Sequence, residues 1–211
     1  MKYALLTVAA LLAAPAAANA ATITNGSFEA ASVNPGGGFT SLGFGSTAIT
    51  GWTVGGAGID YIGGYWQAAD GVRSIDLSGG AAGSISQTIA TVIGQSYNVT
   101  FALAGNPDGG PSTKLLLTLG TPGGLTQVNT FDTTGSTRAD MNWTTFSYRF
   151  RAASTSTTLT FESGTNTAFG PALDQVAIAA VPEPATWAMM IGGIGFAGGA
   201  LRTRRRNAAF A

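Results

Sequence analysis

The sequence of 211 residues contains no cysteine and no histidine, and only 9% of its residues are charged. Without cysteine there is no disulfide, and an oxidising compartment permits disulfides but does not require them in a domain of this size. Without histidine the chain lacks the commonest metal ligand and the usual general base. These absences exclude a Ser-His-Asp or Cys-His catalytic arrangement and a histidine-based zinc site.

Two further features are missing between residues 21 and 181, namely a basic patch and a helical period. This segment has nine acidic and five basic residues, a net charge of −4, because the other five basic residues lie in the two ends of the chain. Nothing in this segment favours binding to the phosphate backbone of a nucleic acid, so nucleic acid is a poor candidate partner. Its abundance of Gly, Ser, Thr and Asn is typical of an extracellular β-protein with many turns.

The amino-terminal end has the three parts of a secretory signal peptide. Met1 and Lys2 form a short charged region, residues 4–14 an apolar region, and Ala18-Asn19-Ala20 a small-residue cleavage site. We therefore predict a signal peptide over residues 1–20. A retained amino-terminal anchor is the alternative, and the small-residue site argues against it.

The carboxy-terminal end combines Pro-Glu-Pro at 182–184, an uncharged stretch over 185–201, and an arginine cluster. Seventeen residues make a helix of roughly 25 Å, which is short for a bilayer core of about 30 Å. The arginines would stay cytoplasmic and leave the preceding domain outside. The residues of this signal are Pro182, Glu183, Pro184, Trp187, Arg202, Arg204, Arg205 and Arg206.

This tail, residues 181–211, resembles the PEP-CTERM sorting signal of Gram-negative bacteria. The resemblance implies recognition by an exosortase-type sorting enzyme, transient anchoring of a transmembrane helix at 185–201 in the inner membrane, and then a location at the cell surface or beyond it. A plain single-pass anchor is the alternative.

Period-two alternation of apolar residues recurs between these ends and predicts strands with one buried face. The expected strand regions are 52–54, 74–77, 84–89, 97–103, 115–119, 146–150, 159–161 and 173–178. Gly, Pro and Asn clusters separate them, residues 34–45 read as a long Gly-rich loop, and residues 179–184 read as a linker. We predict one all-β domain over residues 21–180, a β-sandwich of jelly-roll type.

Several sequence blocks in this domain resemble the choice-of-anchor C family of bacterial surface domains. They are residues 25–29, 51–52, 60–71, 73–77, 104–111 and 170–174. The resemblance implies a galactose-binding-like fold and a surface location, and it brings no enzymatic activity with it.

The same resemblance implies a structural Ca²⁺ site. In many galactose-binding-like modules an acidic residue near the first strand and an aspartate in the last strand hold calcium, and the matching residues here are Glu29 and Asp174. Calcium takes six to eight oxygen ligands, some from backbone carbonyls. The alternative is structural: Glu29 caps a turn and Asp174 accepts hydrogen bonds from backbone amides.

Residues 60–71 are rich in aromatic side chains, which suit sugar binding. Carbohydrate sites need flat aromatic faces for stacking, with carboxylates and amides for the hydroxyl groups. Trp52, Tyr61 and Trp143 are expected in the core instead. The candidate ligand-binding residues are Tyr65, Trp66, Gln67, Asp70, Asn106 and Asp108.

Three functions follow from these patterns, in order of preference. The first is a non-catalytic surface or extracellular-matrix protein that binds extracellular polysaccharide, with no cofactor or with the structural calcium alone. The second is a structural or adhesive protein without sugar binding. The third is a polysaccharide hydrolase that uses two carboxylates, although no spacing among the acidic residues singles out a pair.

Overall fold

The computed structural model describes residues 21–121, 127–182 and 191–195, of which residues 191–195 are helical. The other described residues form an all-β domain with one short 3-10 helix, η1 (Pro107–Gly109). The strands are β1 (Phe39–Leu42), β2 (Thr53–Gly56), β3 (Ile59–Ile62), β4 (Ser74–Asp76), β5 (Gly83–Ala90), β6 (Ser96–Gly105), β7 (Thr113–Thr121), β8 (Gln127–Asp132), β9 (Thr144–Arg151), β10 (Ser156–Ser163) and β11 (Pro171–Ala180).

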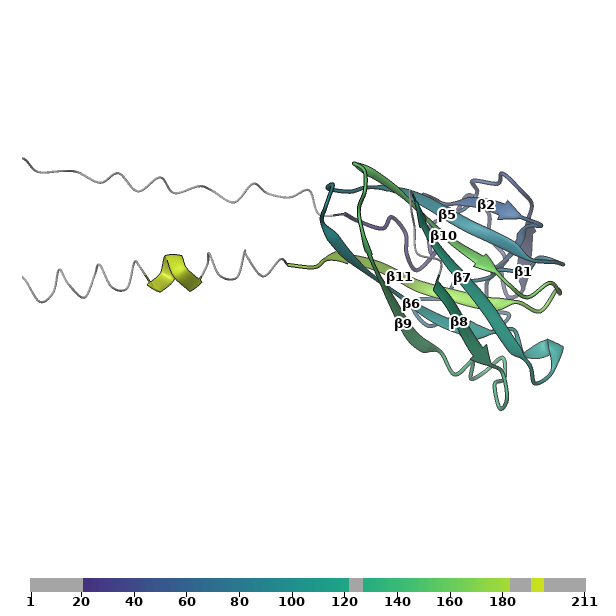
Figure 1. Ribbon diagram of the computed structural model, residues 1–211. Coiled ribbons are helices and arrows are strands. Elements are labelled where there is room, and N and C mark those ends of the chain that lie inside the picture. The colour runs from purple at the N-terminus through teal and green to yellow at the C-terminus, as the bar shows by residue number, and fades with distance from the viewer. Residues whose placement is uncertain (1–20, 122–126, 183–190, 196–211) are drawn as a thin grey trace, which may run out of the picture.

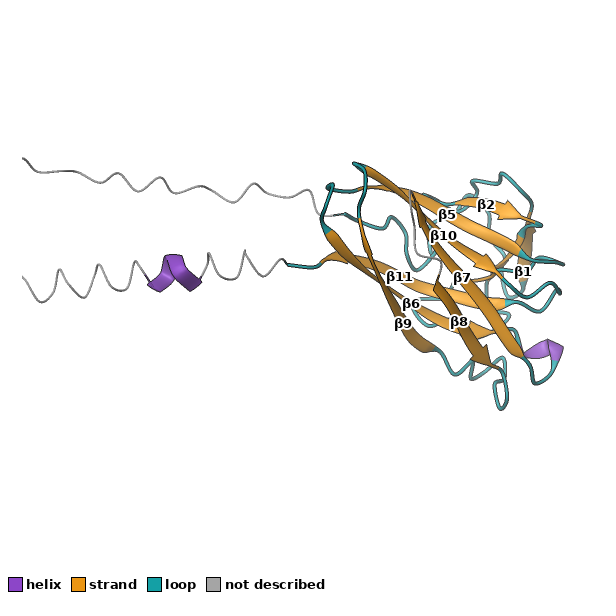
Figure 2. Cartoon of the chain, in the orientation of Figure 1, coloured by secondary structure: helices purple, strands orange, loops and turns teal. Residues whose placement is uncertain are grey.

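These strands form two antiparallel sheets that pack face to face, which confirms the predicted β-sandwich (Figures 1 and 2). One sheet has six strands in the order β1-β3-β4-β11-β6-β9, and the other has five in the order β2-β5-β10-β7-β8. Strands that are distant in the sequence are neighbours in both sheets, so neither sheet is a simple meander.

The core lies between the sheets and follows from the alternation in the sequence. In β5 and β10 every second residue is buried, as expected for strands with one solvated face. At the centre Phe161 packs against both Trp52 and Phe101, with ring centroids 6.3 Å and 5.3 Å apart. Trp52 and Tyr61 are each 1% exposed, which confirms their predicted place in the core.

An irregularity in β11 places one of its side chains, Gln175, on the outer surface. The pairing of β11 with β6 shifts by one residue between Asp174 and Ala177, which makes a β-bulge. Gln175 in the bulge has a φ of 51° and points outward. The N–H of Val176 donates to the carbonyl of Gly26, and a β-carbon on Gly26 would lie 1.9 Å from the Val176 oxygen. The bulge therefore needs a glycine at position 26 to let the amino-terminal segment pass.

The sequence-based strand assignments omit three strands, β1, β3 and β8. Residues 34–45, predicted as a loop, contain β1, whose four residues pair with β3 despite the surrounding glycines. The second omission is β8, an edge strand with alternating burial that pairs with β7. β1 and β8 lie at a sheet edge, where a polar outer face weakens the hydrophobic signal. The third omission, β3, is an inner strand of only four residues, too short to show a clear alternation.

The first and last residues of the described domain lie at the same end of the sandwich (Figure 1). The N–H of Val181 donates to the Ser96 carbonyl, which ties the end of β11 to the β5–β6 turn. The predicted signal peptide, Glu183 to Met190 and residues 196–211 lie outside the described residues. Within the described part of the chain, no helix has the length and apolar character to cross a membrane. The transmembrane helix therefore stays a prediction.

Candidate functional site

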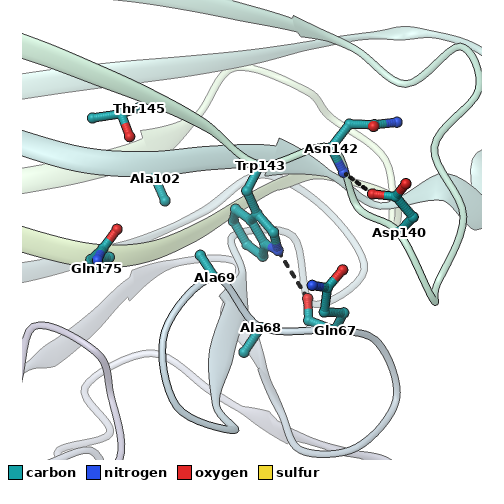
Figure 3. Close-up of a pocket in the computed structure, with 9 residues that line it drawn as sticks. All are labelled: Gln67, Ala68, Ala69, Ala102, Asp140, Asn142, Trp143, Thr145 and Gln175. Atoms are coloured by element: carbon teal, nitrogen blue, oxygen red, sulfur yellow. Dashed lines mark hydrogen bonds between the residues drawn. The ribbon is translucent and has the colours of Figure 1, made fainter.

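A pocket of about 410 Å³ opens on the outer face of the six-stranded sheet (Figure 3). Its floor comes from three neighbouring strands, through Ala102 of β6, Thr145 of β9 and Gln175 in the bulge of β11. Two loops form its walls. The lining residues are Gln67, Ala68, Ala69, Ala102, Asp140, Asn142, Trp143, Thr145 and Gln175. We call this site the Trp143 pocket.

Trp143 stands in the middle of these residues (Figure 3). Its indole Nε1 donates to the carbonyl oxygen of Gln67 at 2.9 Å, so the two walls are joined across the pocket. The side chain packs against the hydrophobic core but is only partly buried, so the prediction that Trp143 is a core residue holds only in part. The reason is its position: Trp143 precedes β9, so the strand does not turn it inward.

The groups around the indole are mostly small or polar. Gln67, Asn142 and Gln175 bring three amide side chains, and Thr145 brings a hydroxyl group. Asn142 has a φ of 55° and Gln175 a φ of 51°, so two non-glycine residues of the lining adopt the left-handed region. Such a backbone costs free energy and tends to occur where function constrains the chain.

The wall that carries Gln67 belongs to residues 63–73, which we call the pocket loop. Asp174 holds its middle: Oδ2 accepts from the N–H groups of Ala69 at 2.8 Å and Asp70 at 2.9 Å. Oδ1 of the same carboxylate accepts from the N–H of Gln175 at 2.6 Å. Asp174 is fully buried, and burial raises its pKa to about 7 against the opposing effect of the three amide donors.

Glu29 holds the end of the pocket loop in the same way. Its Oε1 accepts from the N–H groups of Val72 at 2.7 Å and Arg73 at 2.8 Å. The two carboxylates that the sequence singles out for calcium are therefore close to one loop, but three of their oxygens face amide N–H groups. Among the described residues no group of three or more acidic side chains could hold a metal ion. The calcium site stays a prediction.

The start of the pocket loop is attached by an exposed cluster of Tyr65, Asp108 and Arg138. Arg138 binds Asp108 through both Nε at 2.9 Å and Nη2 at 2.8 Å, and its guanidinium carbon lies 4.0 Å from the Tyr65 ring centre. The Tyr65 hydroxyl donates to Asp108 Oδ2 at 2.7 Å. The Arg138 guanidinium beside Asp108 holds the pKa of that carboxyl below its usual value. The carbonyl of Arg138 accepts from the N–H of Gln67, which links the cluster to the pocket.

The structure therefore does not bring the six candidate ligand-binding residues together in one site. Gln67 lines the pocket, Tyr65 and Asp108 belong to the exposed cluster, and Asp70 accepts from the Ser27 hydroxyl outside the pocket. Trp66 is only 4% exposed and donates through Nε1 to Ser74 Oγ, so its ring offers no stacking face and this prediction is wrong.

Asn106 is the second candidate that the structure removes from the surface. It is 7% exposed, and its Nδ2 donates to Oδ2 of Asp76 at 2.8 Å. Burial raises the pKa of Asp76 to about 7. Asp76 also accepts from the N–H groups of Ser78 and Gly170, so this pair connects three segments of backbone and is structural.

Residues 21–179 match the protein family described as "Protein of unknown function (DUF642)". The chain belongs to the DUF642 family. Residues 180–206 match the PEP-CTERM protein-sorting motif, which implies an exported protein and confirms this part of the sequence-based prediction. The choice-of-anchor C resemblance is not shown by these matches and stays a prediction.

One curated relative of this DUF642 chain is Halomucin of Haloquadratum walsbyi (strain DSM 16790 / HBSQ001), which is 32% identical over 167 residues. The match covers 77% of this chain and only 2% of Halomucin.

Solved structures similar to the DUF642 domain include a family 16 carbohydrate-binding module, with a TM-score of 0.45, 14% identity, and coverage of 74% of this chain and 98% of that chain. Another is the CBM22-1 xylan-binding domain of Paenibacillus barcinonensis, with a TM-score of 0.46, 18% identity, and coverage of 72% of this chain and 99% of that chain.

Proposed function

We propose that this DUF642 domain binds extracellular polysaccharide at the Trp143 pocket, without catalysis, in a protein that an exosortase-type enzyme sorts through the inner membrane to the surface of a Gram-negative cell or beyond. The observation that carries the proposal is the partly exposed indole of Trp143, placed among amide and hydroxyl side chains in an open pocket.

The chemistry of the lining supports a sugar as ligand. The flat face of an indole packs on the apolar C–H face of a pyranose ring, and amide side chains both donate to and accept from hydroxyl groups. Asp140 is the one charged residue among those that line this pocket. A neutral glycan therefore fits better than a strongly anionic one.

The same lining favours binding over hydrolysis. Glycoside hydrolysis commonly uses two carboxyl groups on either side of the scissile bond, about 5 to 9.5 Å apart. Asp140 is the only carboxylate among the residues that line the pocket. Asp174, which precedes the lining residue Gln175, is fully buried and accepts hydrogen bonds from backbone amides.

Affinity electrophoresis tests the proposal, with the purified protein run through gels that contain exopolysaccharide or members of a glycan panel. Replacing Trp143 by alanine removes the stacking face, and we expect the affinity to fall at least about tenfold. Phe44→Ala is the matched control, because Phe44 is 81% exposed and lies outside the pocket.

A second variant is needed because Trp143→Ala also removes the hydrogen bond to Gln67, which attaches the pocket loop. Thr145→Arg fills the floor from an exposed strand position and should block binding while the melting temperature is unchanged. If a glycan retards both variants as strongly as the parent protein, the Trp143 pocket is not the binding site. Absence of retardation on every glycan would favour the structural or adhesive function, and release of reducing ends would show hydrolysis.

A further inference from the structure

The end of the sandwich from which the sorting tail leaves is a single hydrogen-bonded unit. It consists of residues 91–96, 149–155 and 180–182, which we call the tail-side tip. The N–H of Thr91 donates to the Thr155 carbonyl at 2.9 Å, and that of Ala152 to the Gln95 carbonyl at 2.9 Å. Val181 donates to the Ser96 carbonyl at 2.8 Å and accepts from Gln95 Nε2 at 2.7 Å. The start of the tail is therefore fixed to this tip.

Two apolar side chains at the tip point into solvent. Val92 is 39% exposed and Ile93 is 64% exposed. They form one side of a tight turn that the bond from the Gln95 N–H to the Val92 carbonyl closes, with Gly94 at a φ of 84°. A turn of this kind requires a positive φ at its third residue, which glycine supplies without strain. The turn thus holds both side chains outward in a fixed position.

The tip is also positively charged. Arg149 and Arg151 are exposed on the outer face of β9, and the Nε of Arg151 donates to the Gly94 carbonyl at 2.7 Å, beside Ile93. The tip segments contain no acidic residue. The ion pair in the described part of the chain joins Arg138 to Asp108 at the opposite end of the sandwich. Neither arginine of the tip is therefore neutralised by a carboxylate there. If Glu183, the next acidic residue in the sequence, is counted with Arg149 and Arg151, the sum of their charges is +1.

The tail places this tip close to a membrane. Three residues lie between Val181 and Ala185, where the uncharged stretch begins, and an extended chain covers at most about 14 Å over these four steps. The headgroup layer takes up much of this distance, because a bilayer is about 40 to 45 Å thick with headgroups and about 30 Å without them.

We propose that the tail-side tip rests on the bilayer that the sorting tail enters, with Val92 and Ile93 in the interfacial layer and Arg149 and Arg151 on the phosphates of anionic lipids. Exposed apolar side chains beside cationic ones are the combination that binds such a surface. The inference goes beyond glycan binding and rests on the membrane insertion of the tail, which belongs to the proposed function.

The absence of cysteine makes a direct test possible, since a single introduced cysteine takes up one label. The chain from Ala21 to Ala211 is reconstituted into vesicles of phosphatidylethanolamine and phosphatidylglycerol, with a polarity-sensitive fluorophore at Ile93→Cys. We expect the emission to rise at least about twofold and to be quenched by a spin-labelled lipid. Phe169→Cys, an exposed aromatic position at the opposite end, should respond to neither.

Two further arms separate the possible failures. A label at Ala188→Cys reports whether the tail itself inserts; if it does and the Ile93 label stays in water, the tip does not touch the membrane and the inference falls. If neither label responds, tail insertion and the inference fall together, while glycan binding at Trp143 is untouched. Arg149→Glu should reduce the Ile93 signal, as should vesicles of phosphatidylcholine alone, and a signal indifferent to both would contradict the role of the arginines.

Discussion

The pocket loop is held at two places by groups of opposite character. In its middle the buried carboxylate of Asp174 accepts from three backbone N–H groups, and none of its surface is exposed to water. At its start Arg138 and Asp108 form a bidentate ion pair, whose side chains are 50% and 24% exposed.

A visible ion pair does not show which contact contributes most to the stability of this loop. An exposed pair is screened by water and salt and is worth about 0 to 1 kcal/mol. A buried acceptor whose removal leaves amide donors without partners costs much more when it is lost. The wall of the Trp143 pocket should therefore depend on Asp174 and only slightly on Arg138.

Asp174→Ala should have the largest effect. It leaves the N–H groups of Ala69, Asp70 and Gln175 without this acceptor, and we expect the free energy of unfolding in urea to fall by about 3 kcal/mol. Asp174→Asn keeps one oxygen acceptor and should lose about half as much. If the alanine variant unfolds at the same urea concentration as the parent, the buried carboxylate does not hold the loop.

The pH dependence of stability should show the next largest effect. The pKa of Asp174 and of Asp76 is raised from 3.8 to about 7 in the folded protein, so the folded state binds these protons more tightly than the unfolded chain. Their contribution to stability is then complete below about pH 4 and is lost as the pH rises through 7. We expect the melting temperature to fall over this range, with a shallower slope in Asp174→Asn; a slope that this variant leaves unchanged would contradict the assignment.

Arg138→Ala should have a small effect. It removes the ion pair but keeps the backbone carbonyl that accepts from Gln67, so we expect a loss of about 0.5 kcal/mol in urea unfolding. In 1 M salt the parent and the variant should become indistinguishable. A loss as large as that of Asp174→Ala would reverse the comparison.

Removal of calcium should have the smallest effect, because the Oε1 of Glu29 and both oxygens of Asp174 already accept from amides. We expect the melting temperature to be the same with and without a chelator. A clear decrease in the chelator would instead establish the structural calcium site at Glu29 and Asp174.

Much of the fold could be predicted from the sequence because alternation reports a buried face directly. The strands around Phe101, Phe161 and Leu173 have this pattern, and the structure buries all three residues. The failures occur where the pattern is interrupted. β1 is short and lies among glycines, and the bulge after Asp174 shifts the period so that Gln175 turns outward.

The candidate site was harder to predict for a related reason. Aromatic content pointed to Tyr65 and Trp66, but the loop that carries them folds back so that Trp66 donates to Ser74 beneath it. Trp143 looked like a core residue because a strand follows it. Only the fold shows that the loop before β9 lies against the pocket loop, and no local pattern encodes that contact between segments 76 residues apart.

The direction of β11 has a mechanical consequence. A glycan bound at Trp143, as proposed, would pull on the start of β9, whereas an anchored tail would pull on the end of β11, and both strands pair with β6 between them. Because the hydrogen bonds of antiparallel strands run perpendicular to the strands, such a pull loads the bonds from Pro171 to Ala180 together, in shear. A domain tethered in this way resists tension as a whole and does not unzip one bond at a time.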